Sequence, residues 1–281
     1  MNANRDGRDE TRMENWHFSA AARAVPAVVT VAVPSINHGR FLEEALCSIA
    51  EQRVATRILL ADAGSRDETA DVIARWEPRL AGWRSGKDAG QAAAINEAIA
   101  LDDARYVCWM NADDTFLPGG LDTLAAALDA NPTAPMVYGK AWVTNERGGR
   151  LSPAGVMPVT RWILAQRCPI SQPATLIRRT VWEALGGLDE RLQYALDYDL
   201  WWRVLLRFGN PLHIVNYVAT TRTHMDTKTA RARQSHYDEA VSVVRRHYGR
   251  VPIKWRIAWP ISVGARTLYY RWRTFRRQAG S

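Results

Sequence analysis

Short apolar runs alternate with helix-patterned segments between residues 26 and 130, and this alternation limits the possible folds more than any other feature. The runs VVTVAV (residues 28–33), ILLA (residues 58–61) and YVCWM (residues 106–110) have the length and composition of buried strands. Apolar residues at helical spacing follow each run. Because such an order makes right-handed crossovers, the sequence predicts an α/β fold with an open, mostly parallel sheet flanked by helices.

Polar clusters stand where three of these runs end. SINHG follows the first run, DAGS follows the second, and NADD follows the run at residues 106–110. In open α/β sheets the ligand lies at the carboxyl ends of the strands. One cluster would carry little weight, but three at the same edge of the sheet predict one binding site.

The NADD cluster has the chemistry of a cation site. Asn111, Asp113 and Asp114 offer oxygen ligands within four positions. Divalent cations such as Mg²⁺ and Mn²⁺ prefer carboxylate oxygens and keep positions open for substrate phosphates. The structural alternative is that Asp114 or Thr115 caps the turn that follows.

Two further acidic clusters also have a functional and a structural interpretation. Asp62 ends an apolar strand, where a carboxylate suits a nucleobase imide or a ribose hydroxyl, whereas Ser65 or Asp67 beside it suits a helix N-cap. In the DYD cluster, Asp197 or Asp199 would serve as a general base for an acceptor alcohol, which requires reach and partial desolvation. Capping of the helix that follows is the alternative for this cluster.

Composition limits the class of protein and its partners. With 281 residues, of which 47% are hydrophobic and 23% charged, the chain fits one large α/β domain or one domain with an appendage. No apolar run reaches the roughly 18 residues that a membrane-spanning helix needs. Three cysteines without a CxxC pair argue against a disulfide framework or structural zinc, and a net charge of +8 indicates an anionic partner.

Taken in order, the clusters resemble those of the family 2 glycosyltransferases. PSINHGRFLEEALCSI, DAGSRDET and DAGQAAAIN are similar to the family's nucleoside-binding segments, and WMNADDTFLPGGL is similar to its D-x-D metal motif. CPISQPATLIRR and ALDYDLWWR resemble its acceptor-side elements, and RTHMDTKT resembles its histidine-containing tail. The resemblance covers residues 27 to 230 and implies the GT-A fold, a Rossmann-like fold of the nucleotide-diphospho-sugar transferase superfamily.

The resemblance implies roles for individual residues. It makes Asp197 the catalytic base, with Asp199 as the alternative. The metal ligands that it implies are Asp113, Asp114 and His224. The substrate-binding residues that it implies are Pro34, Ser35, Asn37, Asp62, Gly64, Asp88, Gln91, Asn96, Asn111 and Gln172.

The sequence departs from the family pattern at four places. Ile36 stands where an aromatic residue is usual, and SGK (residues 85–87) replaces a common Glu-Pro approach to Asp88. Asn111 replaces an aspartate, which removes one charge but leaves a polar ligand. Leu196 replaces the glutamate of a Glu-Asp pair, so Asp199 stays a second candidate base.

The resemblance and the composition together predict three segments. Residues 1–24 are polar and are expected to form a flexible tail. Residues 25–230 are expected to form the transferase domain, with a nucleotide-sugar half up to residue 130 and an acceptor half from residue 131. Residues 231–281 are expected to form a basic, aromatic helical extension that meets an anionic membrane surface, or else a helix packed on the domain. The aromatic residues of that extension are Trp255, Trp259, Tyr269, Tyr270 and Trp272.

The expected activity is metal-dependent, inverting transfer of a sugar from a nucleotide-diphosphate sugar to an acceptor hydroxyl. The resemblance implies Mn²⁺ or Mg²⁺ as the cofactor, and we expect a saccharide or lipid-linked acceptor in cell-surface polysaccharide or glycolipid synthesis. A cytoplasmic location, with peripheral attachment at the inner face of the cell membrane, fits that acceptor. The alternatives are a catalytically degenerate scaffold and a nucleotidyltransferase, although SINHGRF lacks the Gly-rich basic loop that the latter usually shows. No nucleic-acid partner is expected, because acids in a groove repel phosphates.

Overall fold

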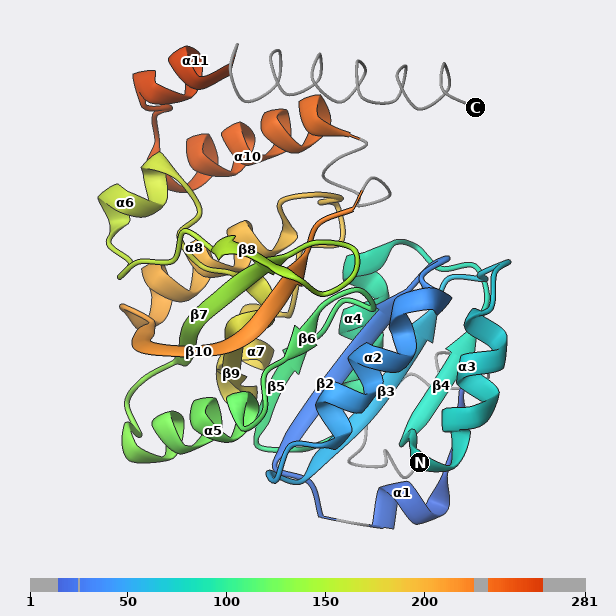
Figure 1. Cartoon of the computed structure of the whole chain (residues 1–281). Coiled ribbons are helices and arrows are strands. Elements are labelled where there is room, and N and C mark those ends of the chain that lie inside the picture. The colour runs from blue at the N-terminus through green and yellow to red at the C-terminus, as the bar shows by residue number, and fades with distance from the viewer. Residues whose placement is uncertain (1–14, 25, 225–231, 260–281) are drawn as a thin grey trace, which may run out of the picture.

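One mixed sheet forms the centre of the computed structural model, which describes residues 15–24, 26–224 and 232–259 (Figure 1). Its strands are β1 His17–Phe18, β2 Val29–Ser35, β3 Thr56–Asp62, β4 Gly82–Ser85, β5 Tyr106–Trp109, β6 Thr115–Phe116, β7 Met136–Thr144, β8 Arg150–Pro153, β9 Thr175–Arg178 and β10 Leu212–Arg222. The strand order is β1-β4-β3-β2-β5-β9-β7-β10-β6, and β8 pairs with β7.

Helices cover both faces of this sheet. The α-helices are α1 Ala20–Ala24, α2 Gly39–Ala50, α3 Thr69–Trp76, α4 Gln91–Ala100, α5 Gly120–Ala130, α6 Arg161–Gln166, α7 Arg179–Leu185, α8 Leu196–Phe208, α10 Arg233–Tyr248 and α11 Ile253–Trp259, and the 3₁₀ turns are η2 Glu77–Arg79 and η3 Gln172–Ala174. Buried side chains of α2, α3 and α5 pack with Val31 and Val33 of β2. Those of α4, α7, α8 and α10 pack with Ala32 and Trp109 on the opposite face.

The first half of the sheet is parallel, as the sequence predicts. Strands β4, β3, β2 and β5 lie side by side in parallel register, with Val31 of β2 between Ile58 and Cys108. Every residue of β2 except Pro34 is buried, which explains a β-branched run without polar alternation. The predicted α/β fold with a mostly parallel sheet flanked by helices is therefore confirmed.

The second half is mixed and was harder to predict. Strand β9 is antiparallel to both β5 and β7, and β10 is parallel to β7. Strand β7 runs without a break from Met136 to Thr144. Strand β10 was not predicted, because its first six residues are exposed or half-buried and its register with β7 shifts twice.

The N-terminal expectation needs correction for residues 15–24, because they form β1 and α1 and bury one side chain, that of Trp16. Strand β1 pairs with β4, and the Trp16 side chain is 6% exposed within the core. The Trp16 indole Nε1 donates a hydrogen bond to Glu97 at 2.5 Å, and Arg84 also donates to Glu97 at 3.1 Å. Because the residues before Trp16 are polar or charged, the sequence pattern does not indicate that the Trp16 side chain is buried. Residues 1–14 lie outside the described residues.

The described part of the C-terminal extension packs on helices α8 and α6. Helix α10 contacts α8 and α6, and α11 follows it at the same end of the molecule (Figure 1). Residues 260–281, with Tyr269, Tyr270 and Trp272, lie outside the described residues. Within residues 15–24, 26–224 and 232–259, no helix combines the length and the apolar character needed to cross a membrane.

Replacing the buried Trp16 with alanine should destabilise the protein by about 3 kcal/mol, because the substitution opens a cavity against the core. Trp162 offers a matched control, since its side chain is 64% exposed and its loss should change stability by less than about 0.5 kcal/mol. Urea unfolding followed by circular dichroism measures both variants. Equal stability of the two variants would contradict the packed role of Trp16.

Candidate active site

The turn after β5 is fixed by a buried carboxylate. Asp114 is 4% exposed, and its side chain accepts hydrogen bonds from the Arg222 backbone N–H at 2.8 Å and from the Asn111 amide at 3.1 Å. Burial is the main cause of the raised pKa of Asp114, and the charge of Asp113 raises that pKa further. Asp114 therefore joins the turn to the end of β10, while its neighbour Asp113 is left to face the cluster described next.

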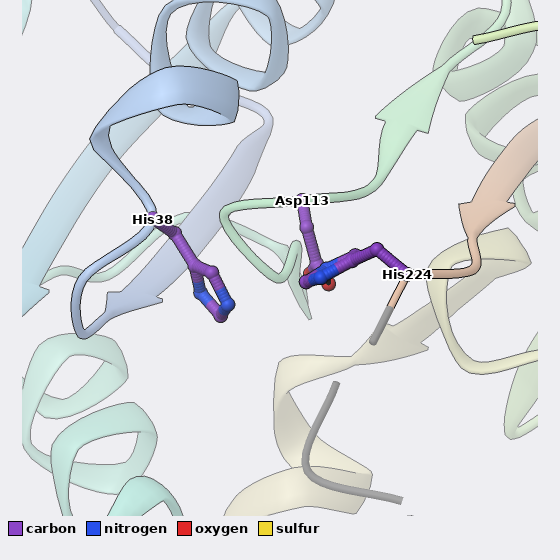
Figure 2. Close-up of side chains that lie close together, drawn as sticks. All are labelled: His38, Asp113 and His224. Atoms are coloured by element: carbon purple, nitrogen blue, oxygen red, sulfur yellow. Dashed lines mark hydrogen bonds and ion pairs between the residues drawn. The ribbon is translucent and has the colours of Figure 1, made fainter. Parts of the chain in front are cut away.

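Among residues 15–24, 26–224 and 232–259, the side chains of His38, Asp113 and His224 form a group that could hold a cation (Figure 2). They come from the loop after β2, the turn after β5 and the residues after β10. One donor atom from each lies within 4.8 Å of the others, and His224 Nε2 is 2.9 Å from Asp113 Oδ2. Burial lowers the pKa of His38, which favours the neutral imidazole that a metal ion needs.

The donor set of this cluster fits a divalent metal ion. Two imidazole nitrogens and a carboxylate oxygen are mixed N/O ligands, which Mn²⁺ accepts more readily than Mg²⁺ does. The structure thus brings together two of the predicted metal residues, Asp113 and His224. Sequence reasoning missed His38, although its place in SINHG at a strand end, next to Asn37, was a usable signal.

A chain of amide side chains crosses the site beside this cluster. Gln91 donates to the Asn111 amide oxygen at 2.9 Å, and Asn111 donates to the Gln172 side-chain oxygen at 3.2 Å. Gln172 then donates to the Trp109 carbonyl at 2.8 Å. Because an amide both donates and accepts, Asn111 can link Gln91 to Gln172, which an aspartate at this position could do only if protonated.

The turn after β3 surrounds Asp62, which is 1% exposed. Its carboxylate accepts hydrogen bonds from the backbone N–H groups of Gly64 at 3.1 Å and Ser65 at 2.9 Å, and from the Ser85 hydroxyl. Gly64 has a φ of 81°, a conformation that glycine adopts without strain. In the described structure Asp62 therefore shapes the turn, and its interaction with a nucleoside stays a prediction.

The turn after β2 is locked to the turn after β3 by Asn37. Asn37 has a φ of 52°, its N–H donates to Ser65 Oγ at 2.7 Å, and its amide oxygen accepts from the Arg66 N–H at 2.9 Å. Pro34 and Ser35 end β2 just before it. At the next strand end, Asp88 accepts from the Gly90 N–H at 2.9 Å. The predicted nucleoside residues therefore line one rim at the carboxyl ends of β2, β3 and β4.

Asp197 stands in the first turn of α8, on the second half of the sheet. Burial raises its pKa to about 6, although the Tyr198 N–H donates to its carboxylate at 2.7 Å. The segment before it lies beside the loop between β4 and α4, because a β-carbon on Gly90 would lie 3.3 Å from the side-chain Nε2 of Gln193. Asp197 therefore has the partial desolvation expected of a general base.

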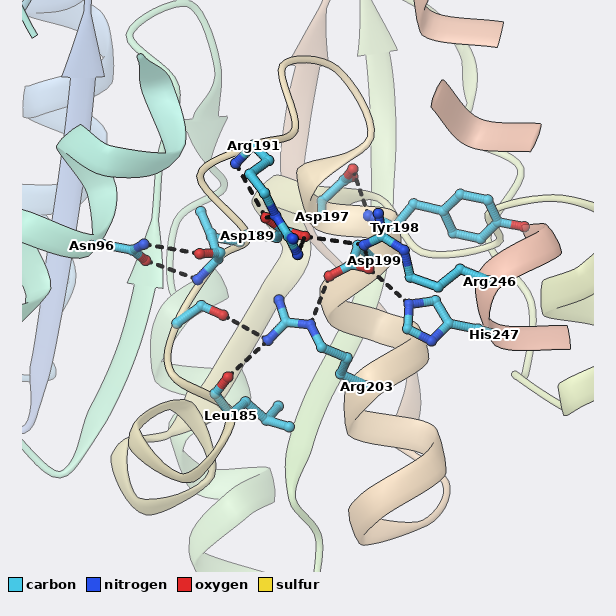
Figure 3. Close-up of polar contacts among 12 residues, drawn as sticks. Asn96, Leu185, Asp189, Arg191, Asp197, Tyr198, Asp199, Arg203, Arg246 and His247 are labelled. Atoms are coloured by element: carbon cyan, nitrogen blue, oxygen red, sulfur yellow. Dashed lines mark hydrogen bonds and ion pairs between the residues drawn. The ribbon is translucent and has the colours of Figure 1, made fainter. Parts of the chain in front are cut away.

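Asp199 has a different environment, which argues against its role as the alternative base. Its carboxylate is 1% exposed and binds Arg203 Nε at 2.6 Å and His247 Nε2 at 2.7 Å (Figure 3). Burial alone would raise the pKa of Asp199, but the His247 hydrogen bond and the Arg203 charge outweigh it and lower that pKa. Because both oxygens of this ionised carboxylate are hydrogen-bonded, Asp199 stabilises the position of α8.

Asn96 links the two halves of the protein. Its amide accepts from the Leu188 N–H at 2.8 Å and donates to the Leu188 carbonyl at 3.0 Å (Figure 3). It also donates to Glu190 at 2.9 Å. These contacts account for its amide in the described structure, so its predicted contact with substrate stays a prediction.

Comparison with known families decides what kind of protein carries this site. The family model described as glycosyl transferase family 2 matches residues 30–181, more than half of the chain. The chain belongs to glycosyltransferase family 2. The family and the transferase activity that the sequence motifs indicate are thereby confirmed.

Two relatives illustrate how far the similarity extends. A PGL/p-HBAD biosynthesis glycosyltransferase of Mycobacterium bovis is 27% identical over 197 residues, which cover 67% of this chain and 73% of that protein. An uncharacterized glycosyltransferase of Rickettsia felis is 25% identical over 191 residues, which cover 63% of this chain. The match covers only 31% of the Rickettsia protein, so the whole relative contains much that this chain does not match.

Two solved structures share the fold. TarS of S. aureus, in complex with UDP-GlcNAc, aligns with a TM-score of 0.62 at 16% identity and covers 79% of this chain and 67% of that chain. The mannosyltransferase PcManGT of Pyrobaculum calidifontis, in complex with GDP-Man and Mn²⁺, aligns with a TM-score of 0.62 at 18% identity and covers 92% and 78%. The glycosyltransferase GT-A fold is therefore confirmed.

Proposed function

We propose that this glycosyltransferase moves a sugar from a nucleotide-diphosphate sugar to an acceptor hydroxyl with inversion, and that the reaction depends on a divalent cation. One observation carries the proposal. A cation-compatible cluster lies at the ends of β2, β5 and β10, and a candidate base, Asp197, has a pKa that burial raises to about 6. Asp197 stands on α8, which follows the Gln193 segment that touches Gly90.

The nucleotide half of the site supports a diphosphate-sugar donor. Asn37, Asp62 and Asp88 stand on adjoining turns at the ends of β2, β3 and β4, and His38 of the cation cluster directly follows Asn37. The structural neighbours named above hold UDP-GlcNAc and GDP-Man, which are donors of this class. A thermal-shift screen of UDP-, dTDP- and GDP-sugars, with Mn²⁺ or with EDTA, identifies the nucleobase of the donor. Stabilisation that is specific for one nucleotide and depends on Mn²⁺ is the expected result.

The proposed chemistry assigns the acceptor proton to Asp197. The acceptor oxygen attacks the anomeric carbon from the face opposite the diphosphate, and its proton passes to the Asp197 carboxylate. The bond between the anomeric carbon and the diphosphate oxygen breaks as the new glycosidic bond forms, through an oxocarbenium-like transition state. His38, Asp113 and His224 would hold the cation, which neutralises charge on the leaving diphosphate.

Removing one ligand of the proposed cation site should weaken metal binding. His38→Ala should lower Mn²⁺ affinity at least about tenfold, because even outer-shell partners of a metal contribute that much. Electron paramagnetic resonance of free Mn²⁺ during a titration measures the affinity without relying on activity. His17→Ala is the matched control, because that exposed histidine stacks on Trp83 at the sheet edge. Equal affinity of the His38 variant and the wild type would exclude His38 as a ligand.

The proposed base makes activity depend on pH in a defined direction. Asp197 must be ionised to accept a proton, so the rate should rise as pH increases and level off above about pH 6. Asp197→Asn should lower turnover about 10²–10⁴-fold with donor binding retained. The control is Asp103→Asn, because the Asp103 side chain is 79% exposed and pairs only at the surface with Arg57. Near-full turnover by Asp197→Asn, with a normal pH profile, would remove Asp197 from this role.

The membrane contact proposed for the C-terminal extension is supported by an exposed apolar and basic face. Ile253 and Ile257 lie one helical turn apart on α11, and their side chains are 72% and 64% exposed beside Lys254 and Arg256. The Trp255 indole on the same helix points inward and donates to the Ala165 carbonyl of α6 at 2.8 Å. A lipid-linked acceptor would explain such a face on an extension that contacts the acceptor half through Trp255.

A vesicle flotation experiment tests this surface. The double variant Ile253→Ser, Ile257→Ser should bind vesicles of anionic phosphatidylglycerol at least about tenfold more weakly, because each buried isoleucine is worth about 1.5 kcal/mol or more. Val215→Ser on β10 is the control, since Val215 is 70% exposed and lies on a different element. Unchanged flotation of the double variant would exclude this face of α11 as a membrane contact.

A further inference from the structure

We propose that α10, which follows the region matched by the family model, positions the proposed base: Glu239 on α10 fixes the segment that leads into α8 and thereby sets the place of Asp197. This inference rests on the proposed function, because it takes Asp197 as the base. The C-terminal extension then contributes to the position of Asp197, with Glu239 as a positioning residue.

The Glu239 carboxylate binds three successive backbone N–H groups. It accepts from Gln193 at 2.9 Å, from Tyr194, and from Ala195 at 2.5 Å. Helix α8 begins at the next residue, Leu196, so these are the amides that lead into the helix. A carboxylate bound to them holds that segment in one conformation and complements the helix dipole.

The sequence around α8 explains why a distant carboxylate is needed. The N-cap position is occupied by Ala195, which has no side-chain acceptor, so the local sequence lacks the Ser, Thr, Asp or Asn that usually caps a helix. Asp197 and Asp199 stand in the first turn. Asp199 binds His247 and Arg203 instead of the helix start. From another helix, Glu239 supplies an acceptor for the N–H of the N-cap residue Ala195 and for the two N–H groups before it.

A second link between α10 and α8 lies on the other side of Asp197. His247 Nε2 is 2.7 Å from Asp199, and Arg246 is 3.4 Å from the same carboxylate oxygen (Figure 3). Arg203, on α8, holds the second oxygen of Asp199 at 2.6 Å and donates to the Leu185 carbonyl at 3.0 Å. Contacts from α10 therefore restrain the chain at residues 193–195 and at residue 199, and Asp197 lies between these two points.

The contacts also separate the positioning role from donor binding. The hydrogen bonds of the Glu239 carboxylate go to the segment before α8, whereas the proposed nucleoside residues Asn37 and Asp62 stand on the first half of the sheet. Loss of the Glu239 carboxylate would leave three N–H groups without this acceptor and free the start of α8. A displacement of about 1 Å at a reacting group can lower turnover about 10²-fold. Turnover should therefore fall while donor affinity stays constant.

The test compares Glu239→Ala, Glu239→Gln and Asp238→Ala in the full chain. Asp238 is the matched control, because it neighbours Glu239 on α10 and binds Gln234 of the same helix at 2.8 Å. Hydrogen exchange at the amides of residues 193–195 should rise at least about tenfold in Glu239→Ala, less in Glu239→Gln, and stay unchanged in Asp238→Ala. This readout requires neither substrate nor metal, and Glu239→Gln decides it if the alanine variant fails to fold.

Turnover of the donor identified by the screen gives the second readout. Release of nucleoside diphosphate should fall about 10- to 10²-fold in Glu239→Ala with an unchanged KM for the donor, and Glu239→Gln should recover part of the loss because its amide oxygen still accepts. Unchanged exchange at residues 193–195, or a loss that appears as donor affinity, would overturn the inference. Asp197→Asn, measured in parallel, separates the two proposals: if it keeps full turnover, the base assignment fails, whatever the Glu239 variants do.

Discussion

The hydrogen bonds of Arg222 hold together the elements on which the cation cluster depends. The Arg222 side chain is 3% exposed, and its Nε donates to the Asp113 carbonyl at 2.9 Å, while the Arg222 backbone N–H donates to the Asp114 carboxylate. Its remaining nitrogens reach the Glu146 carbonyl at 2.8 Å and the Glu44 carboxylate at 2.6 Å. Because a buried guanidinium is costly to leave without partners, these contacts fix the end of β10 against the turn after β5. His224, two residues further on, is thereby placed beside Asp113.

The sequence predicted the parts of the site that strands deliver directly. Asn37, Asp62 and Asp113 follow continuous apolar runs, whose burial on both faces makes them recognisable. His38 was missed although it follows the same kind of run, because a single histidine in a loop carries no periodic signal. Glu239 could not be found by pattern at all, since its partners are backbone amides more than 40 positions away, as the hydrogen bond to Ala195 shows.

Contacts between side chains and backbone groups join the two halves of the protein across the site. Asn96 clamps the backbone of Leu188, and the amide chain from Gln91 through Asn111 to Gln172 spans the same junction. Neither contact is visible in hydrophobic periodicity, because amide pairing depends on the fold that brings the residues together. In the sequence, Asn111 in place of an aspartate indicates the loss of a negative charge. In the structure, the Asn111 amide both donates and accepts hydrogen bonds.

Strands β1 and β6, at the two ends of the strand order, offer only two residues each for pairing. A sheet edge exposes a row of backbone donors and acceptors that can recruit a strand from another molecule. Strand β4 would present four residues of such an edge if β1 did not cover part of it through the pairs of His17 with Trp83 and Phe18 with Gly82. The short N-terminal strand anchored by Trp16 therefore also protects the sheet from intermolecular strand addition. Removing β1 would both destabilise the protein and expose β4 to pairing with a strand of another molecule.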